Sequence, residues 1–430
     1  MRLTPADLAE QGGEDAMLLH FMDTAFLDDP GRVGVAVSGG GDSMALLHVA
    51  CRWMGLSGAQ VEAVTVDHGL RPEAAEEAAM VASFCAERGV PHSILQWDGS
   101  KAEGNLQAAA RAARYSLIAD WAKGRGITHV LLGHTVDDVA ETFVMRLARK
   151  AGVDGLSLME PRFFRNDISW ARPFWQQSRA ELRAYLQRHG VAWAEDPSNA
   201  DLAQQRPKAR QILQALAPLG IDAAGLKTTA LAMSSARTAL EHYALEETRR
   251  IVTFESGDVL IPERPRPPVP REIMRRLYIA AIRYISGAKY PPRESALINL
   301  DAAFISQDRH TIGGCIVNKK DGVLRFTREL NATEGPLSWG NRSLGKMWDG
   351  RWLVTEQEGT NTKGALTIRA LGEAISEVPD WRSTGLPKAS LVASPSVWRG
   401  GELLSAPLAG HQNGFEARIV ADFTSFLVSR

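Results

Sequence analysis

The sequence predicts an α/β protein: an N-terminal region built on a parallel sheet, then a mainly helical region and a small β-rich C-terminal region. Three observations support this fold class. Short apolar runs alternate with longer amphipathic stretches over the first 135 residues, helical patterns dominate from about residue 223, and short segments with Gly and Pro turns follow residue 333. The 430 residues provide enough chain for two or three domains.

Four apolar segments are predicted to be strands buried on both faces, as in parallel sheets: residues 34–37, 61–66, 93–96 and 130–133. Helices are predicted between them at 43–53, 73–88 and 105–123, the last an Ala-rich segment that ends at Gly124. Repeated strand–helix units of this length predict a parallel sheet with right-handed crossovers.

The next elements are a helix predicted at 137–150, a strand near 168–172 and a helix at 178–189. Further along, we predict a helix at 226–251, a proline-dense linker at 261–270 and a helix at 272–287. Alternating apolar residues around the turn signal Asp321-Gly322 predict a hairpin within 311–328. We therefore expect three domains, at 1–220, 221–332 and 333–430.

Composition excludes several classes of protein. Hydrophobic residues make up 45% and charged residues 23%, which are ordinary globular values. No apolar run approaches the roughly 18 to 20 residues of a membrane helix, and the polar, acidic N-terminus resembles neither a signal nor a transit peptide. The three cysteines, Cys51, Cys85 and Cys315, form no CxxC pair and no zinc-like spacing. We expect a cytoplasmic protein with no membrane partner.

Charge is unevenly distributed, although the net charge is only −1. Residues 1–100 carry 5 Lys and Arg against 15 Asp and Glu, whereas residues 262–328 carry 13 against 6. The basic stretch is compatible with a surface that meets nucleic-acid phosphates, but local imbalance of this kind is also common in other proteins.

The strongest local signal is the segment VAVSGGGDSMALLH at residues 35–48. A buried strand ends in Ser38-Gly39-Gly40-Gly41-Asp42-Ser43 and a helix follows at once. Glycines permit positive φ angles and close approach of backbone N–H groups to an anion, and the helix N-terminus adds positive charge. Asp42 is placed to hold a magnesium ion between phosphates. No lysine follows, so this is not a GxxxxGK[ST] loop. The alternative is an ordinary glycine turn with a capping Asp, but the pattern favours phosphate binding.

This motif resembles the pyrophosphate loop of the N-type ATP pyrophosphatases, which adenylate a substrate oxygen and release pyrophosphate. Four further motifs, with C-terminal segments at 313–329 and 348–352, make most of the chain similar to the tRNA(Ile)-lysidine synthetases. The four are VDHGLR at 66–71, GNLQ at 104–107 with Arg111, Arg114 and Tyr115, LGHTVDD at 132–138 with Glu141-Thr142, and Arg172-Pro173 with EDPSN at 195–199.

The resemblance implies an enzyme that uses ATP and Mg²⁺ to adenylate C2 of the wobble cytidine in the CAU anticodon of tRNA(Ile). The ε-amine of L-lysine would then displace AMP to form lysidine. Residues 1–220 would be the catalytic domain, and 221–332 and 333–430 would bind tRNA, with the charged residues of 262–328 on its acceptor stem. Whether the protein is a homodimer stays open.

Site residues follow from matching motif positions. The resemblance implies catalytic roles for Asp42, His134, Asp138, Arg206 and Arg210, with Asp42 and Asp138 also as metal ligands. It implies nucleotide contacts for Ser38, Gly39, Gly40, Gly41, Asp42, Ser43, His68, Arg111, Arg114 and Gly133. From local pattern alone, Asp137 and Asp138 could be a helix N-terminal pair, and His134 a core histidine.

Two positions depart from the family pattern. The basic stretch RNRxR reads Arg206-Pro207-Lys208-Ala209-Arg210 here, and Thr135 replaces the second residue of a histidine pair. Pro207 lacks a backbone donor, so a different local conformation is expected there. Neither departure removes a predicted metal ligand or nucleotide contact, and we expect an active enzyme.

Three rival functions are weaker. A tRNA thiolase of the same superfamily would need paired or iron–sulfur-ligating cysteines, which this sequence lacks. An amidotransferase-type synthetase would need a glutaminase domain or a cysteine after Met1, where Arg2 stands. A binding module that has lost catalysis is disfavoured because Asp42 and Asp138 are present.

Overall fold

The computed structural model describes residues 2–69, 73–99, 106–195, 205–340, 345–357, 364–420 and 422–428. It divides into two compact units, residues 1–237 and 238–430. Helix α10 (Ala223–Ile251) crosses the boundary between them. Among the described helices, none combines the length and apolar character needed to cross a bilayer.

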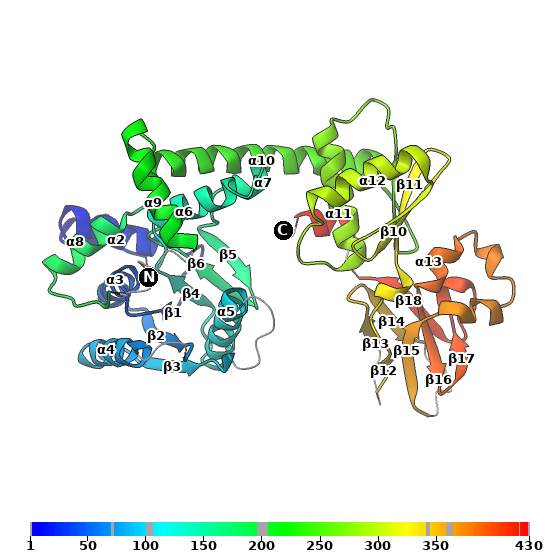
Figure 1. Cartoon of the computed structure of the whole chain (residues 1–430). Coiled ribbons are helices and arrows are strands. Elements are labelled where there is room, and N and C mark those ends of the chain that lie inside the picture. Colours follow the sequence, from blue (N-terminus) through cyan, green and yellow to red (C-terminus); the bar gives the residue numbers. More distant parts are fainter. Residues whose placement is uncertain are drawn as a thin grey trace. The chain divides into compact units, whose positions relative to one another are not determined.

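The described part of the first unit is built on a six-stranded sheet in the order β3-β2-β1-β4-β6-β5 (Figure 1). All strands run parallel except β5, which pairs antiparallel with β6 at one edge. This arrangement confirms the predicted α/β class. The strands are β1 (Arg32–Ala36), β2 (Gln60–Asp67), β3 (His92–Gln96), β4 (His129–Leu132), β5 (Arg162–Arg165) and β6 (Ile168–Ala171).

Helices cover both faces of this sheet. On one face, α2, α3 and α8 pack against β1 through a core that includes Met22, Leu46 and Tyr185. On the other, α5 packs through Ile118 against Val130 and Trp170. The helices are α1 (Pro5–Ala9), α2 (Gly13–Asp23), α3 (Gly41–Ser57), α4 (Glu73–Glu87), α5 (Leu106–Gly124), α6 (Val136–Leu147), α7 (Val153–Leu156), α8 (Arg179–Arg188) and α9 (Gln205–Leu216).

The second unit begins with a five-stranded antiparallel sheet in the order β7-β8-β11-β10-β9, covered by α11. The predicted hairpin is confirmed, because β10 and β11 pair across Asp321-Gly322, both at positive φ. The rest of this sheet was not expected in a region predicted to be mainly helical. The elements are β7 (Thr253–Glu255), β8 (Asp258–Pro262), α11 (Arg271–Ser286), α12 (Glu294–Ser306), β9 (Arg309–Ile312), β10 (Cys315–Lys320) and β11 (Val323–Arg328).

The C-terminal part contains two small antiparallel sheets, β12-β15-β16-β17 and β13-β14-β18, as expected of a β-rich region. The proposed limits at residues 220 and 332 stay a prediction. The elements are β12 (Leu337–Ser338), β13 (Gly345–Trp348), β14 (Trp352–Glu356), β15 (Leu366–Ala370), α13 (Lys388–Val392), β16 (Pro395–Arg399), β17 (Glu402–Ser405), β18 (Phe415–Ile419) and α14 (Phe423–Val428).

Candidate active site

The candidate site lies where the strand order reverses. The chain passes from β1 to β2 and β3 on one side, then returns to place β4 against the other side of β1. In open α/β sheets, ligands bind in the crevice outside the carboxyl ends of the strands at such a switch point. The glycine loop follows β1 and Gly133-His134 follows β4, so both predicted motifs border this crevice.

The glycine loop is held in shape by its two serines. Ser43 Oγ accepts a hydrogen bond from the Ser38 backbone N–H (3.1 Å) and donates one to the Gly40 carbonyl (2.9 Å). Gly39 has φ +87°, whereas Gly40 is extended and forms the N-cap of α3. Only one of the three glycines therefore needs the left-handed region. The first N–H groups of α3 have no partner within the helix, which makes this end of α3 suited to an anion.

Gly133 explains why β4 approaches the loop so closely. A Cβ atom at this position would lie 3.0 Å from both the Asp42 carbonyl oxygen and the Ser43 Cα. Both atoms belong to the backbone, so the contact could be relieved only by moving β4 away from α3. Gly133 thus allows the loop and the end of β4 to form one wall.

Asp137 and Asp138 act on the same arginine in different ways. Asp137 Oδ2 accepts the backbone N–H of Arg179 (2.8 Å), which fixes the start of α8. Asp138 Oδ1 accepts the Arg179 guanidinium (2.9 Å). The other oxygen, Asp138 Oδ2, accepts from the backbone and hydroxyl of Thr135 at 2.9 and 3.0 Å. Asp138 is therefore a helix-capping residue and a pocket carboxylate at once, and Thr135 supplies a donor to it.

Arg179 lies at the centre of a cluster of three carboxylates. Besides Asp138, it donates to Asp42 Oδ2 (3.1 Å) and to Glu141 Oε1 (2.5 Å). Burial raises the pKa of Asp42 to about 6, opposed by the nearby Arg179. The Asp138 carboxylate is also buried, but Arg179 and the other neighbouring cations keep its pKa below the ordinary value.

The predicted arginines of α9 join the same cluster. Arg206 Nη1 donates to Asp138 Oδ1 at 3.1 Å, and Arg210 Nε donates to Glu141 Oε1 at 2.7 Å. Pro207 lies in the first turn of α9, where a backbone N–H would have no helical partner, so the helix accommodates it.

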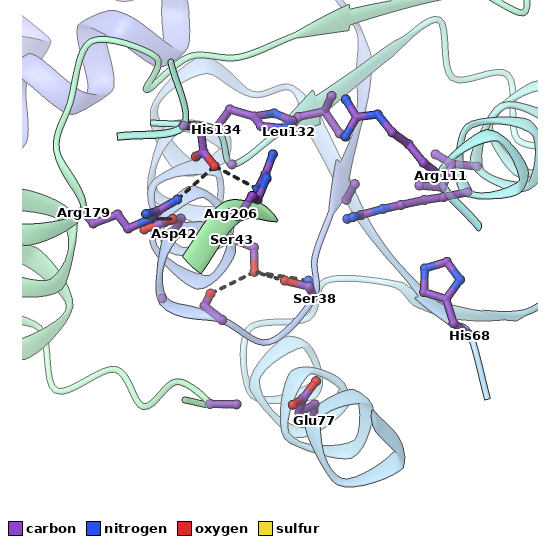
Figure 2. Close-up of a pocket in the computed structure, with 18 of the residues that line it drawn as sticks. Ser38, Asp42, Ser43, His68, Glu77, Arg111, Leu132, His134, Arg179 and Arg206 are labelled. Atoms are coloured by element: carbon purple, nitrogen blue, oxygen red, sulfur yellow. Dashed lines mark hydrogen bonds and ion pairs between the residues drawn. The ribbon is translucent and has the colours of Figure 1, made fainter. Parts of the chain in front are cut away.

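These groups line one cavity of about 800 Å³. All but one of the predicted site residues border it; the exception is Gly39, whose Cβ position faces Glu77 at 3.2 Å. Figure 2 shows His68 on one side and Arg179, Asp42 and Arg206 on the other, with the serines of the loop between them. The lining contains the guanidinium groups of Arg111, Arg114, Arg179, Arg183, Arg206 and Arg210 and the carboxylates of Asp42, Glu77, Asp138 and Glu195. This excess of cations suits a polyanionic ligand.

The histidines of the cavity have low proton affinity. Burial, with Arg114 nearby, lowers the pKa of His68, whose ring packs edge-on against Trp97. Burial lowers the pKa of His134 to about 3, and Arg172 Nε lies 3.2 Å from its Nδ1 atom. Both rings are therefore neutral at physiological pH.

Sequence patterns missed the central role of Arg179. Its carboxylate partners lie 38 to 137 positions away in the chain, so no local spacing links them. The available signal was the capping box of Ser178 and Glu181, which places residue 179 at the first position of a helix. Glu141 was noted only as part of a motif, yet its side chain is almost fully buried between Arg179 and Arg210.

Several motif residues lie outside the described part of the chain: Arg71, Gly104-Asn105 and residues 196–199. Within the described part, none of Cys51, Cys85 and Cys315 lines the cavity, and no group of three or more His, Cys, Asp or Glu side chains is arranged to hold a metal ion.

Comparison with known proteins agrees with this geometry. Residues 14–216 match the family model described as a PP-loop domain. The tRNA(Ile)-lysidine synthase of Ruegeria pomeroyi is 43% identical over 97% of this chain and 98% of its own length. That of Wolbachia pipientis wMel is 37% identical over 72% of this chain and 76% of its own length. By this similarity along nearly its full length, the chain belongs to the tRNA(Ile)-lysidine synthase family.

Proposed function

We propose that this protein joins L-lysine to C2 of the wobble cytidine in the CAU anticodon of tRNA(Ile), at the expense of ATP. In the first step the C2 oxygen attacks the α-phosphorus of ATP and pyrophosphate leaves. In the second, the ε-amine nitrogen attacks C2, the C2–O bond breaks, and AMP leaves with that oxygen. The observation that carries the proposal is the cavity in which the glycine loop, the carboxylates and the arginines meet.

The glycine loop is suited to the departing pyrophosphate. The serines shape the loop, and the first N–H groups of α3 are donors at one end of the cavity. Arg111 and Arg114 project from α5 on another wall, and burial near Arg111 and Arg206 lowers the pKa of Arg114. Such closely spaced cations gain stability when an anion binds between them. These donors would stabilise charge on the phosphate oxygens as the α–β bond breaks.

The carboxylates of Asp42 and Asp138 fit a magnesium ion. Both direct an oxygen toward the same cationic centre, the Arg179 guanidinium. Mg²⁺ binds through one or two carboxylates, with substrate phosphates and water completing its coordination. Bound there, it would neutralise charge on the ATP phosphates. The raised pKa of Asp42, caused mainly by its burial, indicates that a further cation beside this carboxylate would be stabilising.

Asp138 is also proposed to orient the lysine amine, because an anion next to the cavity attracts an ammonium group. Arg206 and Arg210 would handle the tRNA and the reacting groups, as Arg206 is partly exposed while it contacts Asp138. Phosphate contacts from basic residues of 262–328 would add affinity without base specificity. A cytoplasmic site of action and tRNA binding by residues 221–430 belong to this proposal, and a homodimer stays open.

A thiolase reaction is less well supported. It would need a reactive cysteine at the site, but no cysteine lines the described cavity and burial raises the pKa of Cys51 to about 11. A thiol of this kind is a poor nucleophile at neutral pH.

The proposal is tested by incubating the protein with radiolabelled lysine, ATP, Mg²⁺ and tRNA(Ile) bearing CAU, with tRNA(Met) as the control. Label in tRNA(Ile) alone is expected. Label in neither tRNA would reject the assignment, and ATP–pyrophosphate exchange without label would indicate adenylation of another substrate.

Asp42→Asn provides the matched variant. It removes the negative charge of the proposed metal ligand while the side chain keeps its shape, so we expect label transfer to be lost and tRNA affinity to stay nearly unchanged. Both are measured directly, by label incorporation and filter binding. A loss of tRNA affinity would contradict the role given to Asp42.

A further inference from the structure

Arg172 lies immediately after β6, behind the wall of the cavity, and its side chain is buried. Several contacts hold the guanidinium in place, including a side-chain hydrogen bond with Tyr115. Nε donates to His134 Nδ1 at 3.2 Å, Nη1 donates to the Glu160 carbonyl, and the group stacks over the Phe163 ring at 4.4 Å from its centroid. The sequence motif that contains Arg172 gave it no individual role. A donor held in this way constrains the atom that accepts from it.

This contact determines the tautomer of His134. A guanidinium has donors only, so His134 Nδ1 must be the acceptor and carry no hydrogen. A neutral imidazole then carries its hydrogen on Nε2. Protonation of Nδ1 would set two N–H groups against each other, next to the positive charges of Arg172, Arg206 and Arg111. Asp138 is the opposing charge nearby, and the low pKa of His134 shows that burial and these cations prevail.

His134 nevertheless remains accessible to ligands. Its side chain lines the cavity, and no described residue forms a hydrogen bond with Nε2. Figure 2 shows His134 on the Arg206 side of the cavity, away from His68. The Nε2–H group of His134 is therefore free to donate a hydrogen bond to a ligand in the cavity.

We propose that Arg172 is a positioning residue that fixes His134 as a neutral donor, through Nε2–H, to an anionic oxygen of a bound substrate. This proposal rests on the function proposed above. It excludes His134 as the base that takes a proton from the lysine amine, because its Nε2 already carries a hydrogen. The anionic oxygen belongs to a phosphate of ATP or to the carboxylate of lysine, which share the same acceptor chemistry. A preorganised donor of this kind, aimed at negative charge, is an effective catalytic element.

The tautomer is measured on the full chain labelled with ¹⁵N-histidine, by long-range ¹H–¹⁵N correlation. The His134 signals are identified by their absence in His134→Gln. We expect an unprotonated Nδ1 and a protonated Nε2 throughout about pH 6 to 8. In Arg172→Gln the signals should shift toward a mixture of tautomers. A protonated Nδ1 in the unaltered protein would overturn the proposal.

Arg165→Gln is the matched control. Arg165 lies on the neighbouring strand β5 and stacks at 4.4 Å over Tyr115, a hydrogen-bond partner of Arg172, but Arg165 does not contact His134. It should leave the tautomer unchanged. An equal shift in both variants would mean that Arg172 acts only through packing, which would refute its positioning role.

Ligands separate the two sources of the oxygen. A non-hydrolysable ATP analogue and lysine are added separately, and the one that supplies the oxygen should shift the Nε2–H proton signal. If neither ligand shifts the Nε2–H proton signal, the donor role is refuted. These spectra do not depend on lysidine formation, so a protein with the expected tautomer and ATP response but no label transfer would reject only the proposed function.

Kinetics distinguish a donor from a base. Truncation in His134→Ala should lower kcat by about 10²- to 10³-fold, as for other preorganised donors. His134→Gln offers an amide N–H near the position of Nε2 and should recover much of that loss, although an amide is no base. Arg172→Gln should reduce kcat in proportion to the lost tautomer, with KM for tRNA unchanged. Equal inactivity of the Ala and Gln variants would support a base and contradict the proposal.

Discussion

Arg179 shows how one residue can hold the wall of a cavity together. Its guanidinium contacts the carboxylates of Asp42, Asp138 and Glu141, and its backbone N–H is held by Asp137. Three carboxylates in a partly buried cluster repel one another unless a cation lies between them. The wall is therefore stable without a substrate because the protein supplies its own cation.

Arg179→Met should destabilise the first unit by about 3 kcal/mol, because the buried carboxylates of Asp138 and Glu141 lose a partner and Asp42 is left beside them. Thermal unfolding without ligands measures this. Arg183→Met is the control: its ion pair with Glu195 is largely exposed, so its loss should cost at most about 1 kcal/mol. Equal shifts for the two variants would contradict the central role of Arg179.

Gly133→Ala tests the close approach of β4 to the loop. The added methyl group would press on backbone atoms of Asp42 and Ser43, so we expect a loss of about 1 to 3 kcal/mol in stability and weaker ATP binding. Gly55→Ala is the counterpart: it lies within α3 with open space around it and should stabilise the helix by roughly 0.5 to 1 kcal/mol. Unfolding midpoints and ATP titration measure both.

Among the elements, α3 and α8 form a packed pair that links the loop to Arg179. The loop begins α3, Arg179 begins α8, and the helices meet through a buried hydrogen bond of 2.7 Å between His48 Nδ1 and the Tyr185 hydroxyl. Asp15 of α2 also forms hydrogen bonds with His189, at 2.7 Å, and with Arg52. Packing of these helices thus sets the distance between the two parts of the site.

This pair predicts a dependence of stability on pH. Burial lowers the pKa of His48 to about 4, with His189, Arg88 and Arg52 contributing and Asp15 opposing. His48 is protonated in the unfolded chain near pH 6.5, whereas in the folded chain it is protonated only near pH 4. Stability is therefore full above 6.5 and is lost as the pH falls toward 4, by up to roughly 3 kcal/mol.

Urea unfolding over this pH range tests the effect. The glutamine in His48→Gln does not titrate, so this variant should lose less stability as the pH falls from 6.5 to 4. Identical slopes for the two proteins would show that other groups dominate.

Elements with local signals were predictable, and elements that depend on distant partners were not. The strand ending at Ala36 and the helix α5 follow from apolar runs and Ala-rich periodicity. Strand β5 was missed because Phe164 is exposed and Arg162 and Arg165 interrupt the pattern; its hydrogen bonds come from β6. Helix α2 escaped notice since its buried Leu18 and Met22 lie behind an acidic first turn.

At the scale of the whole molecule, the second unit is tied together by buried arginines. Arg328 forms a bidentate pair with Asp349, joining β11 to the turn between β13 and β14. Arg351 donates to the carbonyls of Ile285 and Gly257. Asp258 of β8 accepts from Ser390 of α13 at 2.5 Å. The described parts of the middle and C-terminal regions are thereby held as one body.

Arg351→Met should lower the stability of the second unit by about 2 kcal/mol or more, because two buried carbonyls lose a charged donor. Calorimetry with and without an ATP analogue separates this from the first unit, whose ligand-dependent shift should not change. Arg418→Met on β18 is exposed and should alter stability by less than about 0.5 kcal/mol. A loss of the ligand-dependent shift in Arg351→Met would contradict independent units.

Most of the residues predicted for the site border one cavity. Residues such as Ser43 and His134 were identified by matching motif positions, and both lie near the carboxyl ends of strands that border the switch point. The charge pairing was not predictable, because Arg179 contacts Asp42 only once α8 packs against α3. The tautomer of His134 likewise depends on Arg172, which lies 38 positions away.

The double anchorage of residue 179, by its backbone to Asp137 and by its side chain to Asp138, has a consequence for divergence within the family. Asp138 and Arg179 lie 41 positions apart, yet hydrogen bonds to Asp137 and Asp138 bring Arg179 back to the start of α6. Relatives should therefore tolerate insertions and deletions in the loops between Asp138 and Arg179, outside β5 and β6, provided that the acidic dipeptide and the arginine are retained together.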